Sequence, residues 1–332
     1  MDSKKFDIYD SSFYLFNACE IGNESMVKYL IEHGTDIIIR NKKGKTIIFL
    51  ACNSGNEHLV RHLVNLGANI NEVDNNGTTP IFDACSSGNE HLIKYLEKKG
   101  ADVNNESKKG KTPIFYACSS GNNDLVKYLV EHGVDINKED NNGFTPSFNV
   151  CRSGNGNIVK YLTELRTNIN KESNKSDTPI FDACSSGNEN IIIYLVERDA
   201  DINKKNDHDE TVIFGGCFSE NENIIKYLVE HGVDVNKQDF SGSTALSFAC
   251  YNGYENIVKH LVEHGADINK QDFNGETPIF SACFKRNENI VKYLVEHGAD
   301  INKHDNWGKT LLPFANEMKN INILYYLMGK KK

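Results

Sequence analysis

The sequence predicts an all-α fold, an α-solenoid of about ten stacked helix-turn-helix units with polar β-turn tips between them. A threonine stands six residues before every cysteine from the second one onward, and a leucine stands seventeen residues after each of these threonines. The cysteines are each 33 residues from the next: Cys19, Cys52, Cys85, Cys118, Cys151, Cys184, Cys217, Cys250 and Cys283. An uninterrupted period of this length indicates a repeat architecture.

Residues 79–111 illustrate the first helix of a unit. Thr79 is expected to cap the N-terminus of this helix through its side-chain oxygen, which can accept a backbone N–H. Pro80 follows at the first helical position, where its missing N–H has no cost. Apolar residues then recur at helical spacing as far as Cys85, and Gly88 ends the helix.

The second helix of this unit is expected to begin near Asn89 and to end at Gly100, a residue suited to a left-handed C-terminal stop. Its apolar face carries Leu92, Ile93 and Leu96. The stretch from there to Gly110 is polar and rich in Asp, Asn and Gly, which is typical of an extended turn. Each unit therefore consists of a helix, a tight turn, a second helix and a polar tip.

The period also predicts the organisation of the whole chain. We expect one domain over residues 1–332, with an N-terminal cap repeat at 13–45, eight internal repeats over 46–309 and a C-terminal cap repeat at 310–332. Because one unit cannot close a core by itself, neighbouring units must bury each other's apolar faces. This predicts an elongated monomer, on the order of 100 Å long at the spacing of packed helices.

The recurring pattern D-x-x-G-x-T-P-I-F-x-A-C-x-x-G-N-x-x-I-V-K-Y-L-V-E-H-G-A-D-I-N-K resembles the ankyrin repeat. Its clearest copies are residues 272–302 and 74–104, and the resemblance covers roughly residues 10–328. It implies a non-catalytic scaffold or adaptor that binds a protein partner on a concave face, formed by the tips and the first helices. A second class that it implies is the substrate-receptor subunit of a ubiquitin ligase, or a viral or parasite host-interaction factor. That class usually adds an F-box or similar tail, and only residues 323–332 follow the last helical pattern.

The chain departs from the ankyrin pattern in three ways. Cysteine replaces the second alanine of the usual pair, and two tips carry Ser176 and Asp209 in place of glycine, which puts their regularity in question. Phenylalanine replaces the histidine that usually follows T-P-L, at Phe49, Phe82, Phe115, Phe148, Phe181, Phe214 and Phe280. The cysteine and phenylalanine changes are expected to alter the chemistry of the interior without threatening the fold.

Composition excludes several classes of function. The formal net charge of -9 is opposite in sign to the basic footprint of a nucleic-acid binder, and the lysines at 330–332 are interpreted as a frayed, solvated end rather than a nuclear address. No segment approaches the roughly 18 to 20 apolar residues of a membrane span, and the N-terminus has no secretory apolar region. We therefore expect a cytoplasmic protein with reduced cysteines, with the nucleus as an alternative, and no membrane or nucleic-acid partner.

The spacing of the reactive side chains gives no sign of a catalytic centre. The cysteines occupy a buried position of the first helix, where a free thiol behaves as a small hydrophobic group. Histidines in the motif E-H-G end the second helices and form a ladder instead of converging: His33, His132, His231, His264 and His297. No Ser/His/Asp grouping, phosphate-binding loop or close cysteine pair is present. The sequence therefore predicts no enzyme activity, no cofactor and no metal site.

Asparagines of the D-I-N turns, such as Asn137, Asn269 and Asn302, are expected to bond the backbone of their turn. The resemblance to ankyrin proteins also implies that this position can be a target of asparagine hydroxylases.

One unit is predicted to be weaker than its neighbours. Within residues 199–221, Asp199 replaces the glycine that ends a helix, and Asp209 replaces the glycine of the tip. Gly215 and Gly216 lie inside a short helix, where each glycine costs about 0.5–1 kcal/mol relative to alanine. We expect this unit to open more easily than the others.

The candidate binding residues are six aromatic side chains in the last four units. At the exposed offset of the first helix, the early units carry Glu20, Asn53, Ser86, Ser119, Arg152 and Ser185. At this offset the later units carry the aromatic residues Phe218, Tyr251 and Phe284. Two later tips carry Phe240 and Phe273, and Trp307 lies one place further along the last tip. Since tips and first helices face the same side, these rings are expected to form one protein-binding surface.

Two alternatives to this interpretation remain open. The near-copies KQDFSG and KQDFNG indicate that one tip phenylalanine was inherited twice by duplication, although duplication explains neither the change on the helices nor Trp307. The early tips are basic and offer a different surface for an acidic partner, unless their lysines only solvate the turns: Lys42, Lys43, Lys45, Lys108, Lys109 and Lys111.

Overall fold

The structure, a computed structural model, describes residues 8–330. All of its regular elements are α-helices, twenty in the described part of the chain, and the one β pairing there is an isolated bridge between Gln238 and Thr244. The predicted all-α class is therefore confirmed. Residues 1–7 with Lys331 and Lys332 lie outside the described residues, so the predictions made for the extreme termini are not addressed.

The chain divides into two compact units, Met1–Asn168 and Ile169–Lys332. The helices of the first unit are α1 (Ile8–Glu20), α2 (Glu24–Glu32), α3 (Ile47–Asn53), α4 (Glu57–Asn65), α5 (Pro80–Ser87), α6 (Glu90–Lys98), α7 (Pro113–Ser120), α8 (Asn123–Glu131), α9 (Pro146–Ser153) and α10 (Gly156–Glu164). The helices of the second unit are α11 (Pro179–Ser186), α12 (Glu189–Val196), α13 (Val212–Phe218), α14 (Glu222–Glu230), α15 (Ala245–Asn252), α16 (Glu255–Glu263), α17 (Pro278–Phe284), α18 (Glu288–Glu296), α19 (Leu311–Glu317) and α20 (Ile321–Lys330). The single domain expected over residues 1–332 stays a prediction.

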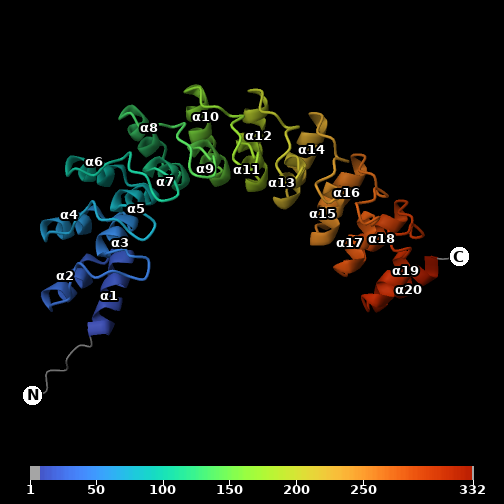
Figure 1. Cartoon of the computed structure of the whole chain (residues 1–332), viewed down its shortest axis with the longest axis horizontal. Helices are drawn as coiled ribbons and strands as arrows, with labels where there is room; N and C mark the ends of the chain where they lie inside the picture. Colours follow the sequence, from blue (N-terminus) through green and yellow to red (C-terminus); the bar gives the residue numbers. More distant parts are fainter. Residues whose placement is uncertain (1–7, 331–332) are drawn as a thin grey trace, which may run out of the picture. The chain divides into compact units, whose positions relative to one another are not determined.

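Within each unit the helices form two rows. The odd-numbered first helices lie side by side in one row, and the even-numbered second helices form the other (Figure 1). Each first helix packs on the first helix of the next repeat and on its own second helix, as α3 does on α5 and on α4. This stacking confirms the predicted helix-turn-helix repeat.

The predicted helix ends are largely confirmed. Gly88 ends α5 with a left-handed backbone, φ 71°, and Gly100 follows α6 with φ 93°. The two tips that lack glycine keep the same conformation, with φ 58° at Ser176 and 59° at Asp209, so their local geometry remains regular. In the D-I-N turns, Asn269 bonds backbone as expected, but in the next repeat and not in its own turn: its Nδ2 donates to the carbonyl of Gly298 at 3.0 Å, and its Oδ1 accepts the N–H of Asp300 at 2.8 Å.

The expected capping bond of Thr79 is absent, which corrects the prediction for this residue. Thr79 occupies the N-cap position with an extended backbone, but its hydroxyl makes no capping bond. The N–H of Phe82, the third helical residue, donates to the backbone carbonyl of Thr79 at 3.0 Å instead. At the same position of α15, Ser247 donates its N–H to Thr244 Oγ1 at 3.3 Å. Buried hydroxyls without a partner recur at Thr79, Thr112, Thr145, Thr178, Thr211 and Thr277.

Asparagines cap the second helices from α2 to α14 instead, and several of them also join neighbouring repeats. Asn89 accepts the N–H of Leu92 at 3.1 Å, and its Nδ2 donates to the carbonyl of Gly55 in the preceding repeat at 2.8 Å. Equivalent bonds to the preceding repeat are made in the first unit by Asn56, Asn122 and Asn155. This position therefore stabilises both the helix and the stack.

We predict that Asn89→Ala and Thr79→Val have very different costs. Asn89→Ala removes a cap and a bond between repeats, so it should destabilise the fold by about 1–3 kcal/mol. Thr79→Val removes a buried hydroxyl that has no partner, so its cost should stay within about 0.5 kcal/mol. Urea unfolding followed by circular dichroism compares the two, and equal losses of stability would contradict the assignment of the caps.

The replaced histidine position forms the centre of the core. Phe49, Phe82, Phe115, Phe148 and Phe280 are fully buried. Phe82 packs edge-to-face on Tyr116 at a centroid distance of 5.4 Å, and Phe280 packs in the same way on Phe314 at 5.2 Å. The departure from the ankyrin pattern thus adds aromatic packing to the interior.

All nine cysteines are buried thiols outside any disulfide, as predicted. Burial in apolar surroundings disfavours the thiolate. It raises the pKa of Cys19 and of Cys283 to about 12, and it raises the pKa of Cys85 and of Cys118 further still. Thiols in such an environment are unreactive.

We therefore predict that a thiol reagent such as dithiobisnitrobenzoate at pH 8 modifies the folded chain at least about 100-fold more slowly than the chain in guanidinium, where all nine thiols should react. Chromophore release measures both rates. A cysteine that reacts in the folded chain as fast as free cysteine would show that the ladder is not buried.

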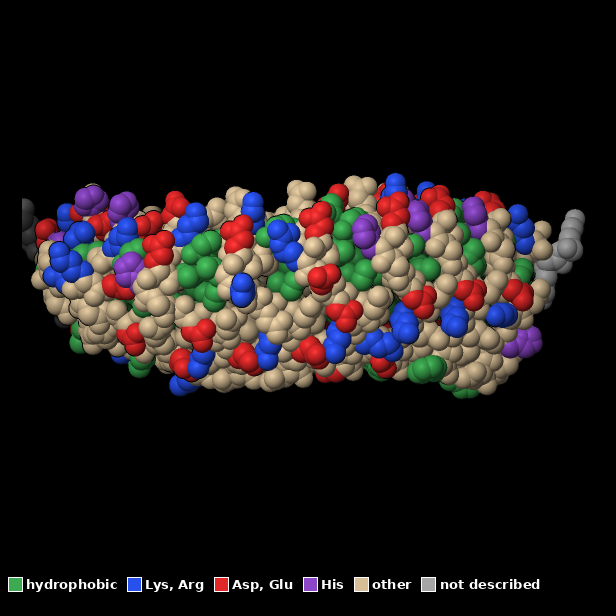
Figure 2. Space-filling view, turned by 90° about the horizontal axis from the view of Figure 1, so that it is seen from above, with side chains coloured by type: hydrophobic (Ala, Val, Ile, Leu, Met, Phe, Trp, Pro, Cys, Tyr) green, Lys and Arg blue, Asp and Glu red, His purple; other side chains and the backbone are tan. Residues whose placement is uncertain are grey.

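The row of second helices forms a charged face. Lysine or arginine pairs with a glutamate one turn earlier on α2, α4 and α6, through Lys28, Arg61 and Lys94. On the face seen in Figure 2, acidic and basic side chains lie among hydrophobic ones. Exposed pairs of this kind contribute little to stability but keep the surface solvated.

Candidate functional site

The six predicted aromatic residues are all exposed, and all belong to the second unit. Their exposed fractions range from 43% for Tyr251 to 68% for Trp307. Phe218 and Phe284 are the last residues of α13 and α17, and Tyr251 lies in the last turn of α15. The other three lie on successive tips: Phe240, Phe273 and Trp307.

Two of the helix residues contact each other across neighbouring repeats. The rings of Tyr251 and Phe284 stack with centroids 6.1 Å apart and planes inclined by 12°. Lys285 Nζ lies 4.1 Å from the centroid of the Tyr251 ring and forms a cation–π contact with it. These three side chains form a small preorganised platform on the ends of α15 and α17.

The tip rings are held by their backbone. The N–H of Phe240 donates to the carbonyl of His208 on the preceding tip at 2.8 Å, and the two rings lie 5.5 Å apart. Phe273 donates in the same way to Ser241 at 3.1 Å. Its ring lies so close to Gly242 that a Cβ there would be 2.7 Å from Phe273 Cδ1. Glycine at 242 therefore serves both the left-handed turn and the placement of the ring.

Buried carboxylates set the shape of these tips. Asp305 Oδ1 accepts the N–H of Trp307 at 2.9 Å and of Lys309 at 2.8 Å. Asp272 holds the preceding tip in the same way, and burial raises the pKa of its carboxyl even though these backbone bonds oppose the shift. The rings are thus presented by turns whose backbone is hydrogen-bonded to these carboxylates.

Of the six rings, Tyr251 and Phe284 contact each other, and no other contact between two of the six is found among the described residues. The other four rings project separately, although Phe240 lies beside His208. Three hollows of about 350, 560 and 470 Å³ are lined by other residues. A row of separate projecting rings suits the surface of a protein partner better than a small molecule, which usually binds in an enclosed pocket.

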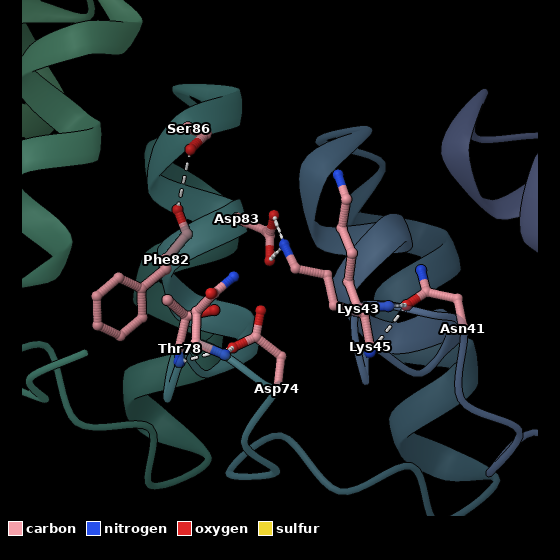
Figure 3. Close-up of polar contacts among 9 residues, drawn as sticks. Asn41, Lys43, Lys45, Asp74, Thr78, Phe82, Asp83 and Ser86 are labelled. Atoms are coloured by element: carbon pink, nitrogen blue, oxygen red, sulfur yellow. Dashed lines mark hydrogen bonds and ion pairs between the residues drawn. The ribbon is translucent and has the colours of Figure 1, made fainter. Parts of the chain in front are cut away.

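The basic early tips are partly engaged within the chain (Figure 3). Lys45 Nζ donates to both carboxylate oxygens of Asp83, at 2.7 and 2.8 Å. Burial raises the pKa of Asp83 although Lys45 opposes this shift. Lys108 donates to the carbonyl of Asn75 at 2.9 Å, and Lys111 lies 3.8 Å from Asp140. Half of the six lysines thus stabilise tips, which weakens the case for a basic docking surface.

One exposed apolar stripe was missed by the sequence interpretation. Ile321, Tyr325 and Met328 lie on one side of α20 and are more than half exposed. The preceding second helix carries Glu288 and Lys292 at the positions of Ile321 and Tyr325. In the sequence, the repeats are compared at offsets of the first helices and the tips only. The same comparison at the offsets of the second helices would have found this change.

A family model for ankyrin repeats, built on three copies, matches residues 15–107, 53–140, 100–173, 134–206, 204–272 and 269–332. Together these stretches cover nearly the whole chain, and the chain therefore belongs to the ankyrin-repeat family. A comparison with curated proteins gave no match. Among the described residues, none of the helices has the length and apolar character needed to cross a bilayer.

Proposed function

We propose that this chain is a non-catalytic interaction module, a scaffold or adaptor, and that it binds a protein partner through the aromatic surface of its second unit. This surface is defined by Phe218, Phe240, Tyr251, Phe273, Phe284 and Trp307. Ankyrin repeats are in general protein–protein interaction modules. The proposal adds the surface to that general role.

One observation carries the proposal. The large hydrophobic side chains that are exposed in the second unit are the six predicted rings together with the three on α20. Clusters of exposed apolar groups mark interfaces, and tyrosine and tryptophan often dominate binding energy there. The rings occupy positions where the early repeats carry polar residues, so packing of the repeat does not require them.

Charge narrows the kind of partner. Residues 169–332 contain 25 acidic and 18 basic side chains, so this unit contributes -7 to the net charge of -9. A partner segment with apolar anchors flanked by lysine or arginine would match both the rings and the acidic surroundings. We propose such a segment as the ligand of the aromatic surface, in a cytoplasmic protein or complex.

Capture of partners from the native cell by the full chain, followed by mass spectrometry, tests this function. The proposal predicts that a purified captured protein binds the chain directly and that binding weakens as salt is raised. If ligase subunits are captured together with a substrate, the chain is a receptor of a ubiquitin ligase. If no protein binds directly, the proposed function is wrong.

A further inference from the structure

A cluster of metal-ligating side chains lies at the end of α16, on the row of second helices. His260 and His264 are one helical turn apart, and Glu263 lies between them. Each residue offers one ligand atom, and these three atoms all lie within 4.8 Å of one another. Among the described residues, this is the one group of three or more metal-ligating side chains that lie so close together. We propose that these residues bind a divalent transition-metal ion such as Zn²⁺.

The tautomer of His264 is fixed by a bond that the other E-H-G histidines also make. Its Nδ1 donates to the carbonyl of His260 at 2.8 Å, which leaves Nε2 with a free lone pair. Histidines that bind metals commonly donate their other ring nitrogen to a backbone carbonyl, because this fixes the tautomer and the ring orientation. The two imidazole rings lie side by side, with centroids 4.7 Å apart and planes inclined by 30°.

His260 is the less usual member of the cluster. Its Nε2 is buried without a hydrogen-bond partner, while its Nδ1 lies 4.0 Å from Glu263 Oε2 and 3.9 Å from Glu222 Oε2 on α14. These distances are too long for hydrogen bonds. Two ligands of a tetrahedral zinc ion lie roughly 3.3–3.6 Å apart, so side-chain shifts of a few tenths of an ångström bring a carboxylate oxygen and Nδ1 to one ion.

The chemistry of the donors selects the ion. Two imidazoles and one or two carboxylates suit zinc and neighbouring first-row metals, whereas calcium and magnesium prefer oxygen ligands alone. Glu222 comes from the preceding repeat, so a bound ion would link α14 to α16.

The site belongs to this repeat because of one substitution. The other E-H-G repeats carry tyrosine at the position of His260: Tyr29, Tyr128, Tyr227 and Tyr293. In each of them the histidine ring packs against that phenol ring, with ring centroids 3.9 to 4.1 Å apart. A neutral phenol is a poor ligand at pH 7. A second pair one turn apart, His58 and His62 on α4, belongs to no group of three in the described residues.

The repeats supply matched variants for the test. His260→Tyr gives α16 the same sequence as α18. His264→Leu introduces leucine, which other repeats carry at the equivalent position as Leu66 and Leu165. His62→Tyr is the control, since it makes the equivalent change on α4, where Tyr95 and Tyr29 stand in the flanking repeats. All three variants keep a residue that the fold already accepts at that offset.

Isothermal titration of the untagged full chain with Zn²⁺ at pH 7.5 measures the stoichiometry and the affinity. We expect the wild type and His62→Tyr to bind one ion with the same affinity. His260→Tyr and His264→Leu should each weaken this binding at least about tenfold, because even the loss of a residue that only orients a ligand costs that much. Circular dichroism verifies that each variant is folded.

Co²⁺ in place of Zn²⁺ gives an independent readout, since absorption near 600 nm of tetrahedral Co²⁺ should appear in the wild type and be absent from His260→Tyr. Absence of Zn²⁺ binding by the wild type would overturn the proposal. So would an affinity within about twofold of wild type in His260→Tyr, or equal losses in His260→Tyr and His62→Tyr.

Discussion

Replacement of Tyr251, Phe284 and Trp307 by alanine together is expected to lower the affinity for the captured partner by at least about 100-fold. Removal of one central aromatic anchor costs about 2 kcal/mol or more, and three such losses exceed the binding energy of a weak interface. The rings are exposed, so the melting temperature should be nearly unchanged. Titration of the purified partner and thermal unfolding of both proteins measure the two effects.

A matched control separates this surface from general stickiness. The triple change of Ile321, Tyr325 and Met328 to alanine also removes three exposed apolar side chains from the second unit, but from α20. It should leave the affinity unchanged. Capture that survives the first change, or is lost only with the second, would place the interface elsewhere. Collapse of the fold in the first variant would show that the rings have a structural role.

The second large effect is expected in hydrogen exchange of residues 199–221, which should exchange about 10- to 100-fold faster than residues 244–268. Asp199, Asp209 and Glu220 have φ of 62°, 59° and 56°. The next repeat has glycine at these positions: Gly232, Gly242 and Gly253. A left-handed backbone costs roughly 1 kcal/mol for a residue with a Cβ, so this repeat should open at a lower free energy.

Restoring the glycines provides the control for this prediction. Asp199→Gly, Asp209→Gly and Glu220→Gly together should slow exchange in residues 199–221 toward the rate of residues 244–268. Equal protection of the two segments in the wild type would refute the weak unit, and unchanged exchange after the three substitutions would refute backbone strain as its cause.

The sequence indicates only that the two glycines inside α13 weaken this helix, but the structure shows that they also have a packing role. A Cβ at Gly215 would lie 3.2 Å from the carbonyl oxygen of Phe181, and one at Gly216 would lie 3.0 Å from Ile225 Cδ1. These glycines therefore allow close packing of α13, and alanine there is expected to cause overpacking instead of the usual gain in helix stability.

The fold could be predicted from the sequence because its information is periodic. Gly88, Asn89 and Gly100 each recur at a fixed offset in most repeats, so one physical explanation of a helix end applies to most of them. The error at Thr79 shows the limit of this reasoning. Thr79 and Thr244 both occupy an N-cap position with an extended backbone, but the hydroxyl of Thr244 accepts the N–H of the third helical residue and that of Thr79 does not. Spacing in the sequence does not give this orientation.

The candidate sites were predictable only in part, for the same reason. The aromatic surface stands out as a departure from the repeat at fixed offsets, and all six rings are exposed in the structure. The stacking of Tyr251 on Phe284 depends on side-chain orientation, which spacing does not give. The cluster at His260 was missed because its histidines were sorted by offset, and residues at different offsets of one helix can still face each other across a turn.

Hydroxyl-radical footprinting of the complex with the purified partner tests the central claim most directly, because it needs no substitution. The account predicts that partner binding protects the six rings of the aromatic surface from oxidation: Phe218, Phe240, Tyr251, Phe273, Phe284 and Trp307. Tyr29, which is exposed on a second helix of the first unit, should stay as accessible as in the free chain. Protection of Tyr29 with no change at the six rings would contradict the account.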